Sequence, residues 1–174
     1  MFWFGGSTDQ APELVDFLEA DADQSVKSNH AYVYRTRLDV TAIASGCGTW
    51  GRHLLGTVAS LPIIFDDQAR HLGQLRESEI EEGVSHEALK SGTNVVLAAG
   101  DLMVFGMTGK RLVLNAELFE LCATEYTLAK TAGAPIKSPS CFARFVATRR
   151  LWADEARAAK RVAVGLLPFA VATS

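Results

Sequence analysis

The sequence contains few of the features that mark specialised classes of protein. Its three cysteines, Cys47, Cys122 and Cys141, are widely spaced and form neither a CxxC metal-binding pattern nor an even set for disulfides. Lys and Arg total 17 against 20 for Asp and Glu, and the net charge of −3 gives no overall steering toward nucleic acid. No uncharged run reaches the roughly 18 residues that span a bilayer, and the N-terminus lacks the basic start of a signal peptide. We therefore expect a reduced cytoplasmic protein that binds neither membranes nor nucleic acid.

The composition is typical of one compact globular domain. A chain of 174 residues, of which 48% are hydrophobic and 21% charged, can bury a real core but is too short for two ordinary domains. It has no internal repeat, low-complexity tract or linker, so we expect residues 1–174 to form a single domain. Predicted helices and strands alternate along the chain, which favours an α/β or α+β fold with helices packed against a central sheet. The predicted helices cover residues 25–36, 52–61, 110–132 and 141–164, and a further helix that begins at residue 8 or 9 and ends at 18. The predicted strands cover 40–44, 63–65, 94–99 and 102–105, and residues 66–82 are expected to be charged and mostly at the surface.

A glycine-rich run follows the first predicted strand of this group. Residues 46–51, GCGTWG, match the G-x-G-x-x-G dinucleotide fingerprint, and Asp66 follows Gly46 by 20 residues. In that fingerprint the glycines let the backbone approach a pyrophosphate at a helix N-terminus, and the acid holds a ribose hydroxyl. Trp50 is bulky for such packing, a helical stretch precedes the motif, and the last third of the chain is almost wholly helical. An NAD(P)-binding role through Gly46, Gly48 and Gly51 is therefore the least favoured function.

Four segments, in order, resemble the class II aldolase/adducin-like family of sugar-phosphate aldolases and epimerases. Residues 30–43, HAYVYRTRLDVTAI, are similar to the family pattern H-x-x-I-Y-R-x-R-P-D-V-x-A-I. Residues 61–73, LPIIFDDQARHLG, resemble the stretch after the family's metal site, and residues 94–106, NVVLAAGDLMVFG, resemble its later strand pair. The helix with Asn115, Ala116, Glu117 and Glu120 is similar to the one that follows. The resemblance covers about residues 25–133. It implies a class II aldolase-like α/β/α sandwich with a central mixed, largely antiparallel sheet, trimmed at the N-terminus.

The same resemblance implies that the family's metal site is lost. Its divalent cation, held by an H-x-H pair and a third histidine in an "HG" dipeptide, polarises a carbonyl and stabilises an enediolate. Ser45 and Cys47 stand where the H-x-H pair belongs, and Gly100 stands where the third histidine belongs. Asp101 replaces the glycine of that dipeptide, and Val26 replaces an acid. We therefore expect no metal and no cofactor, because one thiolate without partners does not make a zinc site.

Five residues remain as candidates for chemistry in the old cleft: Cys47, Trp50, His53, His71 and Asp101. A cysteine among glycines near a helix N-terminus can have a depressed pKa and act as a nucleophile, although a small buried thiol fits the same position. His53 could be a displaced base or a half-buried structural residue, and His71 could point into the cleft or only pack. Asp101 could be a catalytic acid or a turn residue. The family histidine matched by His30 is not a ligand, so packing or hydrogen bonding is the interpretation for it.

Two functional classes follow. In the first, the chain is an enzyme that carries out metal-independent lyase, decarboxylase, isomerase or cyclase chemistry on a small carbonyl compound or sugar-like ligand. In the second, it is a non-catalytic relative that binds a ligand or assembles with another protein. An aldolase with altered metal ligands is a third, weaker reading. A trimmed N-terminal edge exposes apolar surface, so we expect a homo-oligomer with contacts at residues 2–4 and in the uncharged tail, residues 162–174.

Overall fold

The structure, a computed structural model, describes residues 2–4, 13–15, 24–46, 48–55, 61–77, 85–90, 92–98 and 101–168. None of the described helices is both long and apolar enough to cross a membrane. In chain order the elements are β1 (Phe2–Phe4), β2 (Glu13–Val15), α1 (Gln24–Thr36), β3 (Ala42–Ser45), α2 (Thr49–Leu55), the π-helix η1 (Gln68–Leu72), β4 (Arg76–Glu77), β5 (Val95–Ala98), β6 (Asp101–Gly106), α3 (Gly109–Thr131) and α4 (Cys141–Ala163).

The central sheet has four strands in the order β3-β6-β5-β4. β6 pairs antiparallel with both β3 and β5, whereas the short β4 pairs parallel with β5. The β5–β6 pair is the hairpin that the sequence predicts, with Ala98 opposite Asp101 and Val95 opposite Val104. In the β3–β6 pair, Ser45 lies opposite Met103 and Ala42 lies opposite Gly106. Ser45 and Arg111 are therefore near opposite ends of β6, because Arg111 follows the Gly106 end along the chain.

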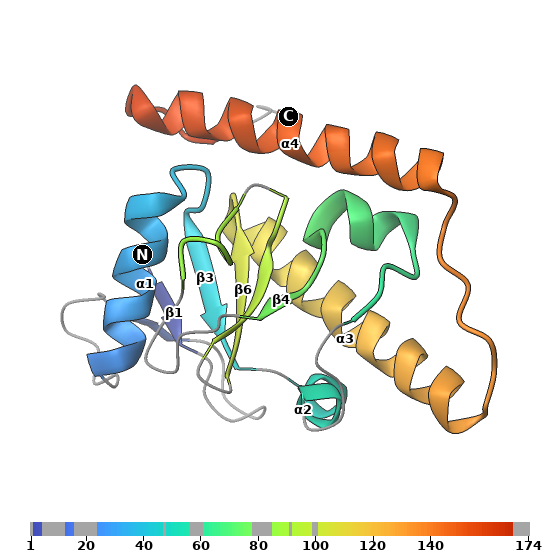
Figure 1. Cartoon of the computed structure of the whole chain (residues 1–174). Helices are drawn as coiled ribbons and strands as arrows, with labels where there is room; N and C mark the ends of the chain where they lie inside the picture. The colour runs from blue at the N-terminus through green and yellow to red at the C-terminus, as the bar shows by residue number, and fades with distance from the viewer. Residues whose placement is uncertain are drawn as a thin grey trace.

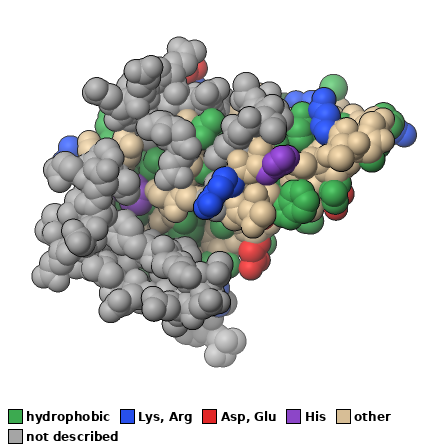
Figure 2. Space-filling view, turned by 90° about the horizontal axis from the view of Figure 1, so that it is seen from below, with side chains coloured by type: hydrophobic (Ala, Val, Ile, Leu, Met, Phe, Trp, Pro, Cys, Tyr) green, Lys and Arg blue, Asp and Glu red, His purple; other side chains and the backbone are tan. Residues whose placement is uncertain are grey.

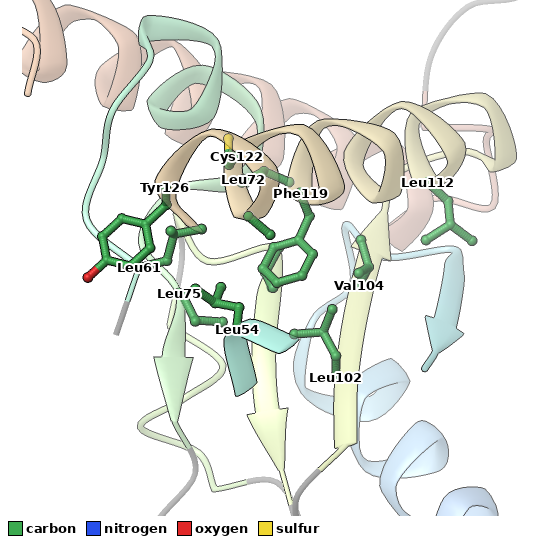
Figure 3. Packing of buried hydrophobic residues seen from close by; sticks show 12 residues of the cluster. Leu54, Leu61, Leu72, Leu75, Leu102, Val104, Leu112, Phe119, Cys122 and Tyr126 are labelled. Atoms are coloured by element: carbon green, nitrogen blue, oxygen red, sulfur yellow. The ribbon is translucent and has the colours of Figure 1, made fainter. Parts of the chain in front are cut away.

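Alternating residues of these strands build two separate hydrophobic clusters, one on each face of the sheet. Val95, Leu102 and Val104 pack with residues of α2, η1 and α3 (Figure 3). Val96, Met103 and Phe105 pack instead with Val33 of α1, Ile43 of β3 and the turn at residues 86–89. This period-two alternation is what a sheet covered on both faces requires. The described part of the chain is therefore a mixed α/β fold with helices on both faces of a small, mainly antiparallel sheet, as Figure 1 shows.

Helix α3 begins directly after β6 and packs tightly against its end. The Thr108 hydroxyl caps the helix by accepting a hydrogen bond from the Arg111 backbone N–H at 3.1 Å. A Cβ atom on Gly106 would lie 2.5 Å from the Leu112 backbone nitrogen, so only glycine allows this approach. The buried Asn115 side chain then donates to the Phe105 carbonyl at 2.7 Å. These contacts fix the first two turns of α3 relative to the sheet.

Helix α4 runs across the ends of the strands at one end of the sheet (Figure 1), where a buried charged cluster holds it. The Arg37 guanidinium donates to both Asp39 oxygens at 2.8 and 2.6 Å, and to Glu155 Oε1 of α4 at 3.2 Å. Glu155 Oε2 also accepts a hydrogen bond from the Gly92 backbone N–H at 2.8 Å. All three charged side chains are buried. Helix α4 also makes an apolar contact, in which Leu151 packs with Met107.

Two short segments differ from the sequence prediction. Residues 13–15, predicted as part of a helix, form strand β2, which pairs with β1 so that Phe2 lies opposite Val15. Residues 63–65, predicted as a strand, belong to no strand and lead into η1. There the Gln68 side chain accepts a hydrogen bond from the Ile64 N–H at 2.8 Å and donates to the Pro62 carbonyl at 3.0 Å. A side chain thus satisfies backbone groups that a neighbouring strand would otherwise pair.

The segment predicted as charged surface is instead partly a core element. Gln68, Ala69 and Leu72 of η1 are buried, and Leu72 joins the cluster under α3. The Gly73 N–H donates to the Gln68 carbonyl at 2.8 Å, which closes the wide turn of a π-helix. Gly73 has a φ of 70°, and a Cβ atom there would lie 1.7 Å from the Gly92 carbonyl oxygen. The chain can therefore leave η1 in this direction only through glycine.

Candidate functional site

The C-terminal end of β3 is where the family resemblance locates chemistry, and the structure describes part of it. Ser45 is the last residue of the strand, and the Gly46 N–H continues the ladder by donating to the Leu102 carbonyl at 2.8 Å. Gly46 has a φ of 100°, which turns the chain out of the sheet toward α2. Cys47 and Gly100 lie outside the described residues. Asp101 is the first residue of β6, opposite Ala98, and its side chain is not described.

A histidine–serine pair occupies this strand end. His30 Nε2 of α1 lies 2.7 Å from Ser45 Oγ, within hydrogen-bond distance. The His30 side chain is 2% exposed, whereas Ser45 is only half-buried. A buried imidazole next to a more accessible hydroxyl is an arrangement that can pass a proton between a bound molecule and the ring. Ser45, which stands where the resembled family has a histidine ligand, is thus paired with a histidine of the same chain.

Helix α1 also packs against β3 through Tyr34. Burial, opposed by the Ile43 backbone, raises the pKa of the Tyr34 phenol. Tyr34 also packs against the cluster that contains Val33 and Ile43. The tyrosine therefore stays neutral at physiological pH. Tyr34 thus packs with residues of both elements that carry the His30–Ser45 pair.

Helix α2 follows the strand end, and a carboxylate of the same chain already occupies its N-terminus. Glu120 of α3 accepts hydrogen bonds from the backbone N–H groups of Trp50 at 3.2 Å and Gly51 at 3.1 Å. A Cβ atom on Gly48 would lie 2.7 Å from the Glu120 carboxyl carbon. These N–H groups are the ones that a pyrophosphate would need. Strand β3 also pairs antiparallel with β6, which is its only partner among the strands described in the central sheet. The glycine run therefore does not have the geometry of a dinucleotide site.

Trp50 and His53 lie on α2, at the same end of the sheet as Ser45. Trp50 is 38% exposed and His53 is exposed. Figure 2 views the molecule from this lower side and shows histidine and basic side chains at the surface. The structure thus brings two of the five predicted residues to the Ser45 end. Among the described side chains, no group of three His, Cys, Asp or Glu residues could hold a metal ion.

His71 lies elsewhere, in a cluster built by η1, α3 and α4. Its Nδ1 accepts a hydrogen bond from Arg111 Nη1 in the first turn of α3. Burial, together with Arg111 and Arg70, lowers the pKa of His71 to about 4, against weaker opposite effects of Asp67 and Asp154. Arg70 in turn forms an ion pair with Asp154 of α4. His71 is therefore a neutral ring near the Gly106 end of β6, away from Ser45.

Sequence reasoning did not identify the basic partners of His71, or Ser45 as the partner of His30. Arg111 lies in the first turn of α3, where a cation is electrostatically unfavourable because of the helix dipole. An arginine at this unfavourable position is the one feature of the sequence that points to a special role for Arg111. The His30–Ser45 contact joins residues of two elements, and no spacing rule indicates it.

No protein-family model matches the chain, and no curated protein matches it. Among solved structures, it is similar to the crystal structure of YgbL from Escherichia coli, which is described provisionally as an aldolase/epimerase/decarboxylase. The TM-score is 0.58 at 15% sequence identity, over 74% of this chain and 67% of YgbL. At this identity the likeness concerns the fold alone, and it supports an aldolase-like arrangement of helices and strands.

Proposed function

We propose that the chain is an enzyme on a class II aldolase-like α/β/α sandwich, with lyase, decarboxylase, isomerase or cyclase chemistry on a small carbonyl compound. The observation that carries the proposal is the hydrogen bond of 2.7 Å between buried His30 and Ser45. It lies at the strand end where the resembled family binds its metal. The aldolase-like fold supports the location, and the residue types support the chemistry.

The chemistry common to these reaction types is proton transfer at the carbon next to a carbonyl. The Ser45 hydroxyl would take the substrate proton as its own proton passes to His30 Nε2, and the reverse transfer would return it. The electrons of the broken C–H bond move into the carbonyl to give an enolate. The other predicted residues, Cys47, Trp50, His53 and Asp101, are the candidates for contacting the substrate and its developing charge.

Exchange of the substrate α-proton with solvent tests this directly. The protein would be incubated in D₂O with a panel of small hydroxyketones, hydroxyaldehydes and keto acids, and deuterium incorporation followed by NMR. His30→Gln and Ser45→Ala should each slow exchange by roughly 10²–10⁴-fold, the usual range for general acid–base groups. His86→Gln, in an exposed turn, is the matched control. Wild-type exchange that persists unchanged in both site variants would refute the role of the pair.

A second candidate function is assembly without catalysis, and the exposed apolar side chains favour it. Phe142 and Phe145 of α4 are 77% and 61% exposed, and Leu121 and Leu128 of α3 are each 50% exposed. Figure 2 shows hydrophobic side chains at the surface on the side where α3 extends. Single-chain solubility rarely tolerates a large contiguous apolar surface. Sedimentation of wild type and of the double variant Phe142→Ser/Phe145→Ser distinguishes the two functions. If the variant becomes a monomer and proton exchange is unchanged, these residues form an oligomer contact of an enzyme. If wild type assembles but exchanges no proton with any compound, the second function is favoured.

A further inference from the structure

Three basic side chains and one carboxylate meet where η1, α3 and α4 come together. Arg70 and His71 belong to η1, Arg111 to the first turn of α3, and Asp154 to α4. Arg157, one turn further along α4, also approaches Asp154, with Nη1 3.5 Å from Oδ1. A π-helix is a rare element that often occurs at functional sites, so its position in this cluster gives a reason to examine the chemistry.

Arg70 and Arg111 have N–H donors without a carboxylate partner among the described residues. Arg111 has no carboxylate within ion-pair distance among the residues that the structure describes, and its Nη1 donates to the neutral His71 ring. Arg70 bonds to Asp154 through Nη2, but its Nη1 is buried without a hydrogen-bond partner in the described part of the chain. A buried donor without an acceptor costs about 1–3 kcal/mol. Asp154 therefore forms ion pairs with Arg70 and Arg157, and it opposes the Arg111 charge without pairing with it. Asp67 acts on His71 in the same way.

The histidine adds a further donor. A guanidinium can only donate, so His71 Nδ1 is the acceptor and the neutral ring carries its proton on Nε2. Burial lowers the pKa of Arg111, and the nearby Arg70 charge lowers it further. Burial and both arginines also lower the pKa of His71. Arg111 and His71 are only half-buried, so solvent molecules can approach them. The cluster thus presents several N–H donors to which an anion with several acceptor oxygens could bind.

We propose that Arg70, His71 and Arg111 form a binding site for a small oxyanion, specifically a phosphate group, at the junction of η1, α3 and α4. Planar guanidinium groups bind tetrahedral oxyanions through paired N–H donors, and more than one arginine matches a dianion better than a monoanion. Asp154 is the internal competitor, because it holds Arg70 and Arg157 when no ligand is bound. The site lies near the opposite end of β6 from the His30–Ser45 pair and does not depend on the proposed catalytic function.

The test is a titration with inorganic phosphate and, separately, with glycerol phosphate, followed by calorimetry at low salt. Arg111→Gln should weaken binding of the preferred compound by roughly 10–100-fold, the loss expected for charge-assisted hydrogen bonds. The same change should raise the melting temperature of the free protein, because it removes a cation from the first turn of α3 and from the vicinity of Arg70. Weaker binding by a more stable protein cannot be explained by misfolding.

Two further variants complete the test. Asp154→Asn should tighten phosphate binding several-fold, since Arg70 and Arg157 lose their internal acceptor. Arg149→Gln removes an exposed arginine of the same helix α4 and should change affinity less than twofold. Saturable binding of either phosphate compound, with this pattern among the variants, supports the site. The compound that binds more tightly shows whether the site prefers free phosphate or a phosphate ester. Binding that is absent in wild type, equal in Arg111→Gln and wild type, or weaker in Asp154→Asn would overturn the proposal.

Discussion

Replacement of Glu155 by Gln should change how stability depends on pH, and the size of the change follows from the buried cluster. Arg37 already donates two hydrogen bonds to the Asp39 carboxylate, which balances its charge, so Glu155 brings a second negative charge into a buried site. Burial, opposed by Arg37, raises the pKa of Glu155 from 4.5 to about 7. The folded state therefore binds the Glu155 proton more tightly than the unfolded state. Stability from this group is complete below pH 4.5 and disappears as the pH rises through 7.

The expected magnitude is about 3 kcal/mol, because one pKa unit corresponds to 1.36 kcal/mol. Between pH 5 and pH 8 the change should be about 2–3 kcal/mol, since part of the effect lies below pH 5. His71 acts in the opposite direction. Its pKa of about 4 lies below the ordinary 6.5, so the unfolded ring binds more protons and stability rises with pH between 4 and 6.5. Because His71 is only half-buried, solvent screening reduces that effect to roughly 1–2 kcal/mol.

The two groups thus partly cancel in wild type, and only the variants separate them. Urea unfolding at pH 5 and pH 8 would be measured for wild type, Glu155→Gln, His71→Gln and the exposed control Glu117→Gln. The stability difference between wild type and Glu155→Gln should favour wild type by about 2–3 kcal/mol more at pH 5 than at pH 8. A difference that stays constant within about 0.5 kcal/mol would refute the reasoning, because Glu155 would then titrate alike in both states.

Two other substitutions test the packing of the fold. Asp39→Asn removes a bidentate partner from a buried guanidinium and should lower the free energy of unfolding by about 3–5 kcal/mol in urea titrations; a loss below about 1 kcal/mol would contradict its buried role. Gly73→Ala places a methyl group 1.7 Å from a carbonyl oxygen at a φ of 70°, and should cost at least about 3 kcal/mol. Gly133→Ala has a similar φ of 64° with nothing within 4 Å, so it should cost only about 1 kcal/mol, and equal losses at the two glycines would mean that the steric contact has no effect.

The elements predicted best are those with long, regular patterns. Helix α3 was expected at residues 110–132 and occupies Gly109–Thr131, and α4 was expected at 141–164 and occupies Cys141–Ala163. The β5–β6 hairpin also follows from its spacing. Short apolar segments were predicted poorly: residues 13–15 form a strand because β1 pairs with them, and residues 63–65 remain outside the sheet because Gln68 binds their backbone. The conformation of such short segments depends on residues that are distant in the sequence, so the local sequence does not determine it.

The candidate sites follow the same division. The family resemblance directs attention to Ser45 because its position is defined by sequence order. The Arg111–His71 contact joins residues that are 40 positions apart, and it depends on how α3 packs against η1. No pattern in the sequence specifies that packing. The position of His71 away from Ser45 has the same origin, since both lie in segments that resemble the family, and only the folded chain separates them.

The Glu120 carboxylate at the start of α2 has a consequence for any compound that reaches the Ser45 end. The chain supplies its own anion to the backbone donors there, through the bonds to Trp50 and Gly51. A negatively charged group arriving beside them would meet like charge, at donors that already bind a carboxylate, which costs binding free energy. If catalysis occurs at this end, we expect neutral substrates to be selected over phosphorylated or acidic ones. Glu120 would then disfavour the binding of anionic substrates, and the substrate preference would shift toward anions in Glu120→Gln.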